Sequence, residues 1–541
     1  MRAIPLNETD GSLQPAAWDA QTRLDTHHRD YTNTSDSRTI ITYEDSANNN
    51  TSVGKPFTWN DLNQDMRDML HKNAADVPDG QGEARLLFLR GDNANEGKGN
   101  NYRQRIHLLG DIIHSAPFYV GAPPFPDVLG NDYSAFYNAN LNRTPMIYVG
   151  ANDGMLHAFN SNTGNETLPY VPYTVFKNLS QLTSPVYSHR YYVDGTPTVE
   201  DARGSFGTSR CGAVASCWRS ILVSGLRQGG QGVFALDVTS PSAFQEANAS
   251  KLVLWEFTDI DDADLGYTYS QPSIVKMANN KWAAVFGNGY NNTEADGNAS
   301  TTGNAVLYIV FLEGGIDGVW TADTDYIKID TGVGETLATP TPNGLATPAA
   351  VDIDSDFITD YIYAGDLRGN VWKFDVTDVN PQAWKSSSTR LFTATTATGP
   401  QPITVRPEVG RHFHSDEGIM VYVGTGKYLE TSDNSLTGPK HIMYALWDKL
   451  GTTTPTILRS ELLQQEVLPD LTTVRVTSNK AINWDQHMGW YIDLPDAGER
   501  YANEPSASAQ PAPHFYHHYS QCRSVWHRGK ELADGSRCLY R

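Results

Sequence analysis

The sequence predicts an all-β protein, most of it a β-propeller of seven blades. Three observations favour this fold: a composition rich in turn residues and aromatics, two strand patterns that alternate along the chain, and a glycine that recurs once in each repeat. The 541 residues include 45 Gly, 29 Pro, 27 Tyr and 12 Trp, which is typical of β-rich chains with many turns. This length accommodates several domains or one large repeat architecture.

Residues 1–105 are polar and irregular, and we expect them to form a lead-in segment before the repeats. A helix is predicted over about Trp59–His71, with Thr58 as its N-cap, because a hydroxyl there can accept from a free amide of the first turn. A strand is predicted over Arg85–Leu89. The predicted propeller begins after this lead-in, at residue 106.

Two strand patterns alternate over residues 106–504, the predicted propeller. One is a strand that follows a proline, and its prolines are Pro117, Pro197, Pro272, Pro348 and Pro407. The other ends in glycine and is followed, across a turn, by a strand of alternating aromatics; its glycines are Gly150, Gly225, Gly287, Gly365 and Gly424. One small antiparallel sheet cannot bury both faces, so the repeats must stack, and radial stacking is a propeller. Five copies with partial strands at both ends indicate six to eight blades, and we favour seven.

A loop in the fourth repeat, residues 352–360, carries acids at positions 1, 3, 5 and 9, the spacing that opens an EF-hand-type calcium loop. The predicted calcium ligands are Asp352, Asp354, Asp356, Asp360 and the carbonyl of Ile358. Phe357 replaces the usual glycine at position 6, and Tyr363 replaces the usual glutamate at position 12. The alternative is an Asp-rich turn whose side chains cap backbone amides. Calcium is favoured because acids this dense repel one another without a cation.

Two other groups are weaker metal candidates. The first is an acidic run without a glycine turn, better explained as a solvated, turn-capping loop: Asp259, Asp261, Asp262 and Asp264. The second is the pair His412 and His414, which alternate along a predicted strand and are better explained by ordinary hydrogen bonds. The expected cofactor is therefore a single Ca²⁺.

Charge argues against nucleic acid as a partner, and hydropathy argues against a transmembrane segment. Lys and Arg number 41 against 62 Asp and Glu, a formal net charge of −21, whereas nucleic-acid binding needs a basic footprint. No run of about 18 apolar residues occurs, so no transmembrane segment is predicted. The first ten residues lack the apolar stretch of a signal peptide. From its residues alone, the chain is cytosolic or a piece of something longer.

Cys211 and Cys217 enclose five small residues, a loop that a disulfide could close. A metal site is the less favoured alternative, because no histidine pair lies nearby in sequence. The count of four cysteines alone does not decide between them.

Long motifs in this chain are similar to the PilY/PilC family of type IV pilus biogenesis factors. The motifs are His114–Pro117, Tyr148–Phe159, Gly229–Asp237, Leu254–Asp259, Asp264–Tyr267, Val285–Asn291 and Tyr363–Asp375. The resemblance extends from about residue 80 to about 504. It implies a quinoprotein-like propeller, the C-terminal domain of a protein carried at the pilus tip and on the outer membrane.

The resemblance also implies a function. Members of the family promote pilus assembly, oppose retraction and act as adhesins toward host or abiotic surfaces, with pilins and minor pilins as partners. Their Asp-rich loop binds calcium, and the metal state tunes extension against retraction and hence twitching. They carry a signal peptide and a further N-terminal region, so we expect that Met1 is not the natural start. Export through an oxidising periplasm then predicts a disulfide between Cys211 and Cys217.

Two other functions use the same fold: a calcium-dependent carbohydrate-binding propeller and a quinone-cofactor dehydrogenase. Such dehydrogenases resemble one another in a cofactor site on the propeller axis, commonly with adjacent cysteines. This chain has no Cys-Cys pair, and its acidic loop does not converge with a basic cluster. We therefore expect a non-enzymatic protein.

The tail, residues 505–541, departs from the strand and turn patterns before it. Reading Tyr519–Arg541 one nucleotide later with permitted codons can give a glycine turn and an aromatic strand, as the next repeat requires. This favours a frameshift between roughly Glu504 and His514, with Cys522 and Cys538 as its accidents. A divergent natural tail is the alternative.

Overall fold

The structure, a computed structural model, describes residues 1–7, 9–26, 38–45, 53–97, 102–124, 131–334, 342–397, 399–412, 418–435, 437–450, 456–468 and 476–501. The chain divides into two compact units. The first comprises Met1–Gly344, Asp352–Asp360 and Val376–Ser386, and the second comprises Leu345–Val351, Tyr361–Asp375 and Ser387–Arg541.

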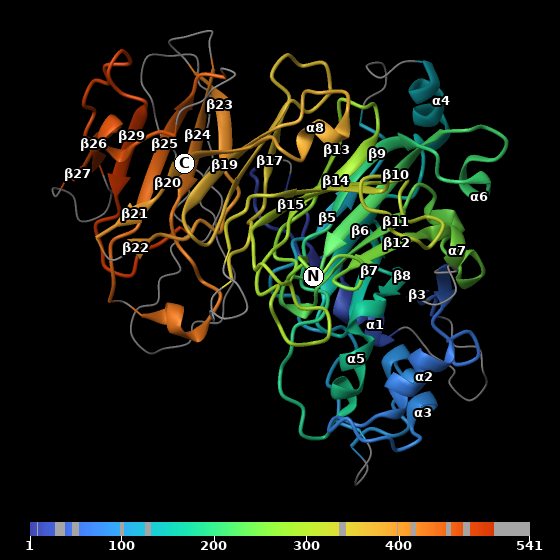
Figure 1. Cartoon of the computed structure of the whole chain (residues 1–541). Helices are drawn as coiled ribbons and strands as arrows, with labels where there is room; N and C mark the ends of the chain where they lie inside the picture. Colours follow the sequence, from blue (N-terminus) through green and yellow to red (C-terminus); the bar gives the residue numbers. More distant parts are fainter. Residues whose placement is uncertain are drawn as a thin grey trace. The chain divides into compact units, whose positions relative to one another are not determined.

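Three sheets make up most of the first unit (Figure 1). The first sheet has six strands, in the order β4 (Val53–Pro56), β3 (Ile41–Glu44), β8 (Glu166–Val171), β7 (Met155–Asn160), β6 (Met146–Ala151) and β5 (Phe118–Val120). The second contains β9 (Thr198–Gly204), β10 (Cys217–Gly225), β11 (Gly232–Asp237) and β12 (Val253–Thr258). The third contains β13 (Ser273–Lys276), β14 (Trp282–Gly287), β15 (Val306–Phe311) and β16 (Tyr326–Asp330).

The second unit holds two sheets of the same antiparallel pattern. One contains β17 (Ala349–Val351), β18 (Tyr361–Gly365), β19 (Asn370–Asp375) and β20 (Ser388–Thr393). The other runs β23 (Glu408–Arg411), β24 (Ile419–Gly424), β25 (Ile442–Asp448), β29 (Gly489–Asp493) and β26 (Leu463–Gln465), with β26 parallel to β29. Short two-stranded pairings are β1 (Arg2–Ala3) with β2 (Trp18–Asp19), β21 (Thr395–Thr396) with β22 (Gly399–Pro400), and β27 (Val467–Leu468) with β28 (Val476–Thr477).

The prolines and glycines of the repeat mark strand ends, as predicted. In all five sheets the first strand begins at the residue after the proline, because proline has no N–H to give to the ladder. The second strand ends at the repeat glycine in four sheets and one residue later in the first. At Gly150 and Gly225 a Cβ would lie 2.2 Å and 2.8 Å from the carbonyl oxygens of Val193 and Thr268. The glycine leaves room for the segment that leads to the next sheet.

The all-β prediction is confirmed, with few and short helices. They are α1 (Ala20–Thr26), α2 (Gln64–His71), α3 (Gly82–Arg90), α4 (Asn131–Asn140), α5 (Phe176–Leu179), α6 (Thr208–Cys211), α7 (Ala249–Leu252) and α8 (Pro381–Trp384). Among the described residues, no helix is both long and apolar enough to cross a membrane. Five propeller-type sheets are present in that part of the chain, and the total of seven blades stays a prediction.

The lead-in differs from expectation in three ways. It supplies β3 and β4 to the first sheet, where β3 pairs in parallel with β8. The helix near residue 60 begins only at Gln64, since Asn63 rather than Thr58 caps it by accepting from the Met66 amide at 2.9 Å. The strand predicted over Arg85–Leu89 is wrong, because these residues lie in helix α3. Ala, Leu and Arg favour a helix, and the apolar run lacks the alternation of a half-buried strand.

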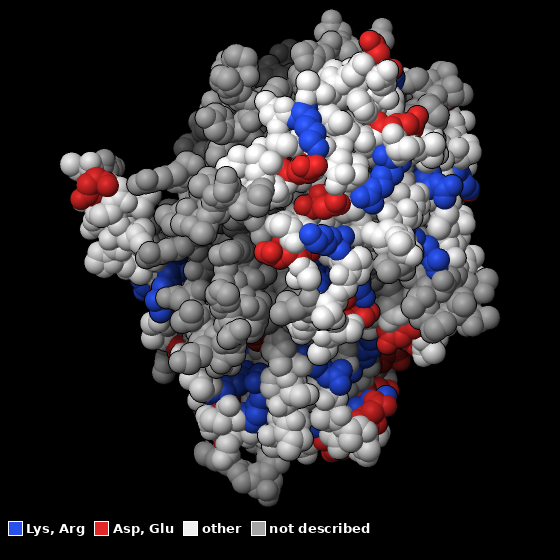
Figure 2. Space-filling model, turned by 90° about the vertical axis from the view of Figure 1, so that its left-hand side faces the viewer, with Lys and Arg blue, Asp and Glu red and all other residues white. Residues whose placement is uncertain are grey.

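The core of the first unit runs through its three sheets. β5 contacts β9, and β9 contacts β13, so the proline-led strands of neighbouring sheets lie side by side. Trp255 of β12 is completely buried and donates from its indole N–H to the Leu312 carbonyl at 3.1 Å, which links the second sheet to the third. On the face drawn in Figure 2, basic and acidic side chains intermingle rather than forming a stripe of one sign.

Candidate metal centre

The loop Asp352–Asp360, which connects β17 to β18 along the chain, brings three of the predicted ligands together. One carboxylate oxygen from each of Asp352, Asp354 and Asp356 lies within 4.8 Å of the others, and all three residues are exposed. Two oxygens bound to one calcium ion are separated by at most about twice the ~2.3–2.6 Å bond length. The spacing of these carboxylates therefore fits a shared cation.

The backbone of the loop turns tightly because side chains within it accept its amides. Asp352 accepts from the N–H of Ser355 at 2.7 Å and of Phe357 at 2.9 Å. Ser355 and Phe357 have φ values of 67° and 68°, a left-handed conformation that non-glycine residues rarely adopt. Phe357 thus takes the kind of backbone conformation for which glycine is usual at position 6. The Thr359 N–H donates to the Lys276 carbonyl at 2.9 Å, which ties the loop to β13.

The other two predicted ligands, Asp360 and the carbonyl of Ile358, lie in the same loop, but Asp360 is not part of this three-carboxylate cluster. Asp360 is partly buried and accepts from the Ile353 N–H at 2.8 Å. Its pKa is raised above the ordinary value, mainly by burial and further by the charges of Asp354, Asp352 and Asp356. Mutual repulsion of this kind is what a bound cation relieves. Ile358 lies in the same loop, where its N–H donates to Asp356 at 2.7 Å.

Two acids of the second acidic run, Asp262 and Asp264, are paired with a lysine. Lys328 Nζ lies 2.9 Å from both Asp262 and Asp264, and Asp262 also accepts from the hydroxyls of Tyr308 and Tyr326 at 3.0 Å. Asp261 accepts from the Thr258 N–H at 2.8 Å. The contact of Asp261 supports the turn-capping part of the prediction for this run. Its solvated part is wrong for Asp259 and Asp262, which are buried.

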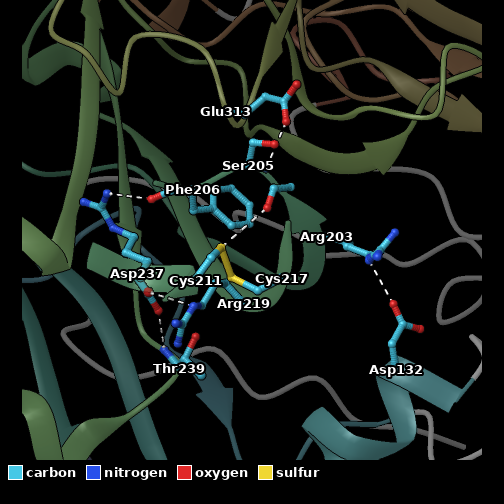
Figure 3. Close-up of a disulfide and its surroundings, with 12 residues drawn as sticks. Asp132, Arg203, Ser205, Phe206, Cys211, Cys217, Arg219, Asp237, Thr239 and Glu313 are labelled. Carbon is cyan, nitrogen blue, oxygen red and sulfur yellow. Dashed lines mark hydrogen bonds and ion pairs between the residues drawn. A yellow bond between two sulfur atoms is a disulfide. The ribbon is translucent and has the colours of Figure 1, made fainter. Parts of the chain in front are cut away.

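The structure joins Cys211 and Cys217 by a disulfide, with their Cα atoms 5.4 Å apart (Figure 3). Cys211 ends α6, and Cys217 begins β10, so the bond closes the connection between β9 and β10. In the same connection the Ser205 N–H donates to Glu313 at 3.0 Å, which holds it against the third sheet. Cys522 and Cys538 lie outside the described residues, as does the whole segment 505–541.

Of the two histidines His412 and His414, the structure describes only His412. His412 is buried and stacks on Trp447, with ring centroids 4.4 Å apart, while Trp484 meets its edge at the same distance. Such packing indicates a core histidine. His414 lies outside the described residues.

Sequence reasoning missed a buried charge cluster in the first sheet. His157 of β7 lies between Asp153 and Glu166, and Arg38 from the lead-in pairs with Glu166. The available signal was a histidine in an otherwise apolar strand, between Leu156 and Phe159. Asp153 and Glu166 are only four and nine residues from His157, but Arg38 is 128 residues from Glu166, too far along the chain for spacing to reveal it.

Five repeated, mainly antiparallel sheets of four to six strands in the described part of the chain, with a surface loop of oxygen ligands, define a β-propeller protein with a candidate cation site. The family model for the PilY1 beta-propeller domain matches residues 109–480. The chain belongs to this family.

Individual relatives agree with the family match. Type IV pilus biogenesis factor PilY1 of Pseudomonas aeruginosa (strain PAK) is 35% identical over 533 residues, covering 89% of this chain and 42% of that protein. A PilY1 homolog of Xylella fastidiosa (strain Temecula1 / ATCC 700964) is 38% identical over 439 residues, covering 76% and 28%. The crystal structure of the P. aeruginosa PilY1 C-terminal domain matches with a TM-score of 0.56 and 33% identity, over 72% of this chain and 80% of that one. The chain thus spans less than half the length of these two curated relatives.

Proposed function

We propose that this chain is the propeller part of a non-enzymatic, calcium-binding type IV pilus biogenesis factor that is exported to the cell surface. The proposal rests on membership of the PilY1 propeller family and on relatives named as pilus biogenesis factors. The observation that carries its calcium part is the cluster formed by Asp352, Asp354 and Asp356.

In this proposal the loop holds one Ca²⁺ through Asp352, Asp354, Asp356, Asp360 and the carbonyl of Ile358. Calcium supplies positive charge that offsets the repulsion of the carboxylates and fixes the loop in one conformation. Because Thr359 ties the loop to β13, the cation state alters a surface of the first unit. We propose that this surface meets pilins or minor pilins, and that calcium thereby regulates extension against retraction, adhesion and twitching.

Calorimetry with Asp354→Ala tests the calcium site. The unchanged chain is expected to bind one calcium ion with a Kd in the range ~10⁻⁷–10⁻³ M. Asp354→Ala should abolish that binding without unfolding the protein, because Asp354 is exposed and its loop is local. Asp317→Ala is the matched control, since Asp317 is an exposed acid in another turn whose side chain accepts from the Val319 N–H at 3.1 Å. Undiminished uptake by Asp354→Ala contradicts the assignment.

The same substitution in the full-length protein tests the cellular role. Cells that carry Asp354→Ala should differ from the parent in surface piliation and twitching, whereas Asp317→Ala cells should not. Loss of calcium binding without any change in either trait would leave the metal site standing and refute its regulatory role.

A further inference from the structure

A cavity of about 580 Å³ lies within the first unit, between the segment 103–112 and the turn that joins β6 to β7. Its size is within the ~300–1,000 Å³ usual for small-ligand sites. Its walls combine arginines with aliphatic side chains, among them Arg38, Arg103, Arg105, Ile106, Leu108 and Met155. The cavity is separate from the calcium loop and from the disulfide, and the proposed function makes no use of it.

Two of the three arginines are committed to the fold. Arg38 makes a two-pronged pair with Glu166, at 2.6 and 2.8 Å. Arg105 pairs with Glu96 through Nε at 2.7 Å and donates to the carbonyls of Phe88 and Asp92 at 2.7 and 2.9 Å. Their charges are compensated, and their donors are occupied.

Arg103 differs from both. It is held by one hydrogen bond, from Nε to the Leu182 carbonyl at 2.7 Å, and by its guanidinium lying over the Tyr187 ring, 4.2 Å from the centroid. In the part of the chain that the structure describes it forms no ion pair, and its terminal amino groups have no partner. The stacking and the Nε bond fix the plane of the group. A pre-oriented fork of N–H donors suits a planar carboxylate, which it can bind through two parallel hydrogen bonds.

The charge around the cavity indicates a ligand with one negative charge. Among the described arginines of this wall, Arg103 alone lacks an ion-pair partner, while the two acids that line it, Asp153 and Asp111, lie 3.1 and 2.8 Å from ring nitrogens of His157 and His189. The single charge of a carboxylate matches this one guanidinium, whereas a dianion such as phosphate would keep one charge without a cationic partner here.

The apolar wall indicates the rest of the ligand. Ile106 is 88% exposed, Met155 and Leu182 are buried, and Leu108 and Ile112 are half-buried. These aliphatic groups suit a hydrocarbon chain. One face of Tyr187 is covered by Arg103, so the stacking on aromatic faces that sugars favour is not available on that side.

We propose that this cavity binds a carboxylate carried on an aliphatic chain, with Arg103 as the carboxylate-binding residue and Ile106 as part of the apolar wall. Such a group has two sources: a free aliphatic carboxylate, or an acidic side chain between aliphatic residues of a peptide. Both present the same chemistry to the cavity.

The test uses the whole chain and calorimetry with octanoate, and octan-1-ol as the uncharged probe. Octanoate should bind at least tenfold more tightly than octan-1-ol, and Arg103→Gln should weaken octanoate at least tenfold. Arg203→Gln is the matched control, because Arg203 is a half-exposed arginine of β9 paired with Asp132 (Figure 3), and it should change the affinity less than twofold. Ile106→Asp is the second variant: it adds a negative charge to the wall at an exposed position and should also weaken octanoate at least tenfold while the melting temperature stays unchanged.

A second arm separates the two sources. The peptide acetyl-Leu-Glu-Leu-amide is compared with acetyl-Leu-Gln-Leu-amide on the same four proteins. Binding of the Glu peptide that Arg103→Gln and Ile106→Asp both weaken supports a peptide ligand, and the same dependence for octanoate alone supports a free carboxylate. Binding of neither probe, or binding that both substitutions leave unchanged, overturns the proposal.

Discussion

His157 belongs to a buried charge cluster through which the first sheet contacts the lead-in. Its side chain is completely buried, with Nδ1 2.7 Å from Glu166 and Nε2 3.1 Å from both oxygens of Asp153. Burial lowers the pKa of His157, but Asp153 and Glu166 outweigh it and raise the pKa to about 9. Burial likewise opposes ionisation of Glu166, yet Arg38 and His157 hold its pKa well below the usual range. The cluster is therefore a charged His–carboxylate group that ties the lead-in to the sheet.

The raised pKa of His157 and the lowered pKa of Glu166 determine how the stability contributed by this cluster changes with pH. The raised pKa of His157 stabilises the fold fully below its unfolded value of ~6.5, and this stabilisation is lost as pH rises through about 9. The lowered pKa of Glu166 stabilises the fold above its ordinary value, and this is lost in acid. We predict that the difference in unfolding free energy between the unchanged protein and His157→Gln falls by roughly 3 kcal/mol between pH 6.5 and 9. Chemical denaturation at a series of pH values measures it, and a difference independent of pH contradicts it.

At the residue scale, the acidic loop was predictable from sequence but the His157 cluster was not. Four acids within nine residues are close in space by necessity, so spacing alone placed Asp352, Asp354 and Asp356 together. Arg38 and Glu166 are 128 residues apart, and only the pairing of β3 with β8 makes them neighbours. The uncompensated charge of Arg103 is likewise visible only once the partners of the other arginines are known.

At the scale of elements, strand ends were predictable and short connections were not. The repeat prolines and glycines mark boundaries because each acts on its own backbone, although Pro169 inside β8 shows that a single proline does not always do so. The consecutive apolar residues of helix α3 predict a strand wrongly, because a short apolar run fits either structure. Strands β3 and β4 have four residues each, and they exist only because the first sheet offers β8 as a partner.

The connection between β9 and β10 is the element whose stability is most open to test. Its Arg210 donates to the carbonyls of Lys251, Ser250 and Val253 at 2.8, 3.0 and 2.7 Å. The disulfide at the adjacent Cys211 limits how far this residue can move. We predict that Cys211→Ser with Cys217→Ser lowers the unfolding free energy by ~2 kcal/mol. A reducing agent should lower the melting temperature of the unchanged protein but not that of this double variant.

Replacing Cys522 and Cys538 by serine provides the matched control, and these substitutions should leave the effect of the reducing agent intact. Mass spectrometry of alkylated, non-reduced protein checks the bond directly. Alkylation of both Cys211 and Cys217 after export would refute the disulfide.

At the scale of the whole molecule, adjacent sheets of the first unit are joined by buried side chains as well as by packing. Glu256 of β12 accepts from the Tyr170 hydroxyl of β8 at 2.5 Å and from the Tyr173 N–H at 2.7 Å. Its second oxygen accepts from the hydroxyl of Thr174 at 3.1 Å. The carboxyl group of Glu256 in the second sheet therefore binds both the last strand of the first sheet and the segment that follows it.

The contact of Glu256 with the chain that follows the first sheet should make stability depend on pH. Burial raises the pKa of Glu256 to about 7, even though its hydrogen bonds act to lower it. The folded state then binds the proton more tightly than the unfolded state. The stabilisation is present below the ordinary value of 4.5 and is lost as pH rises through about 7. Glu256→Gln removes the titration and keeps one accepting oxygen. We predict that the unchanged protein loses roughly 3 kcal/mol of unfolding free energy relative to this variant between pH 4.5 and 8.

The comparison must be made between the two proteins at each pH. Burial also raises the pKa of Glu200 and of Asp261 to about 7, so the unchanged protein loses stability over this range for more than one reason. His157 remains charged below pH 6.5, so the change between pH 4.5 and 6.5 separates Glu256 from the histidine cluster. The amide of glutamine faces the donors of Thr174, which shifts the variant's stability by a constant. The test is therefore how the difference in unfolding free energy between the two proteins changes with pH. A difference that stays constant from pH 4.5 to 8 would show that Glu256 is ionised throughout, because its four hydrogen-bond donors outweigh burial.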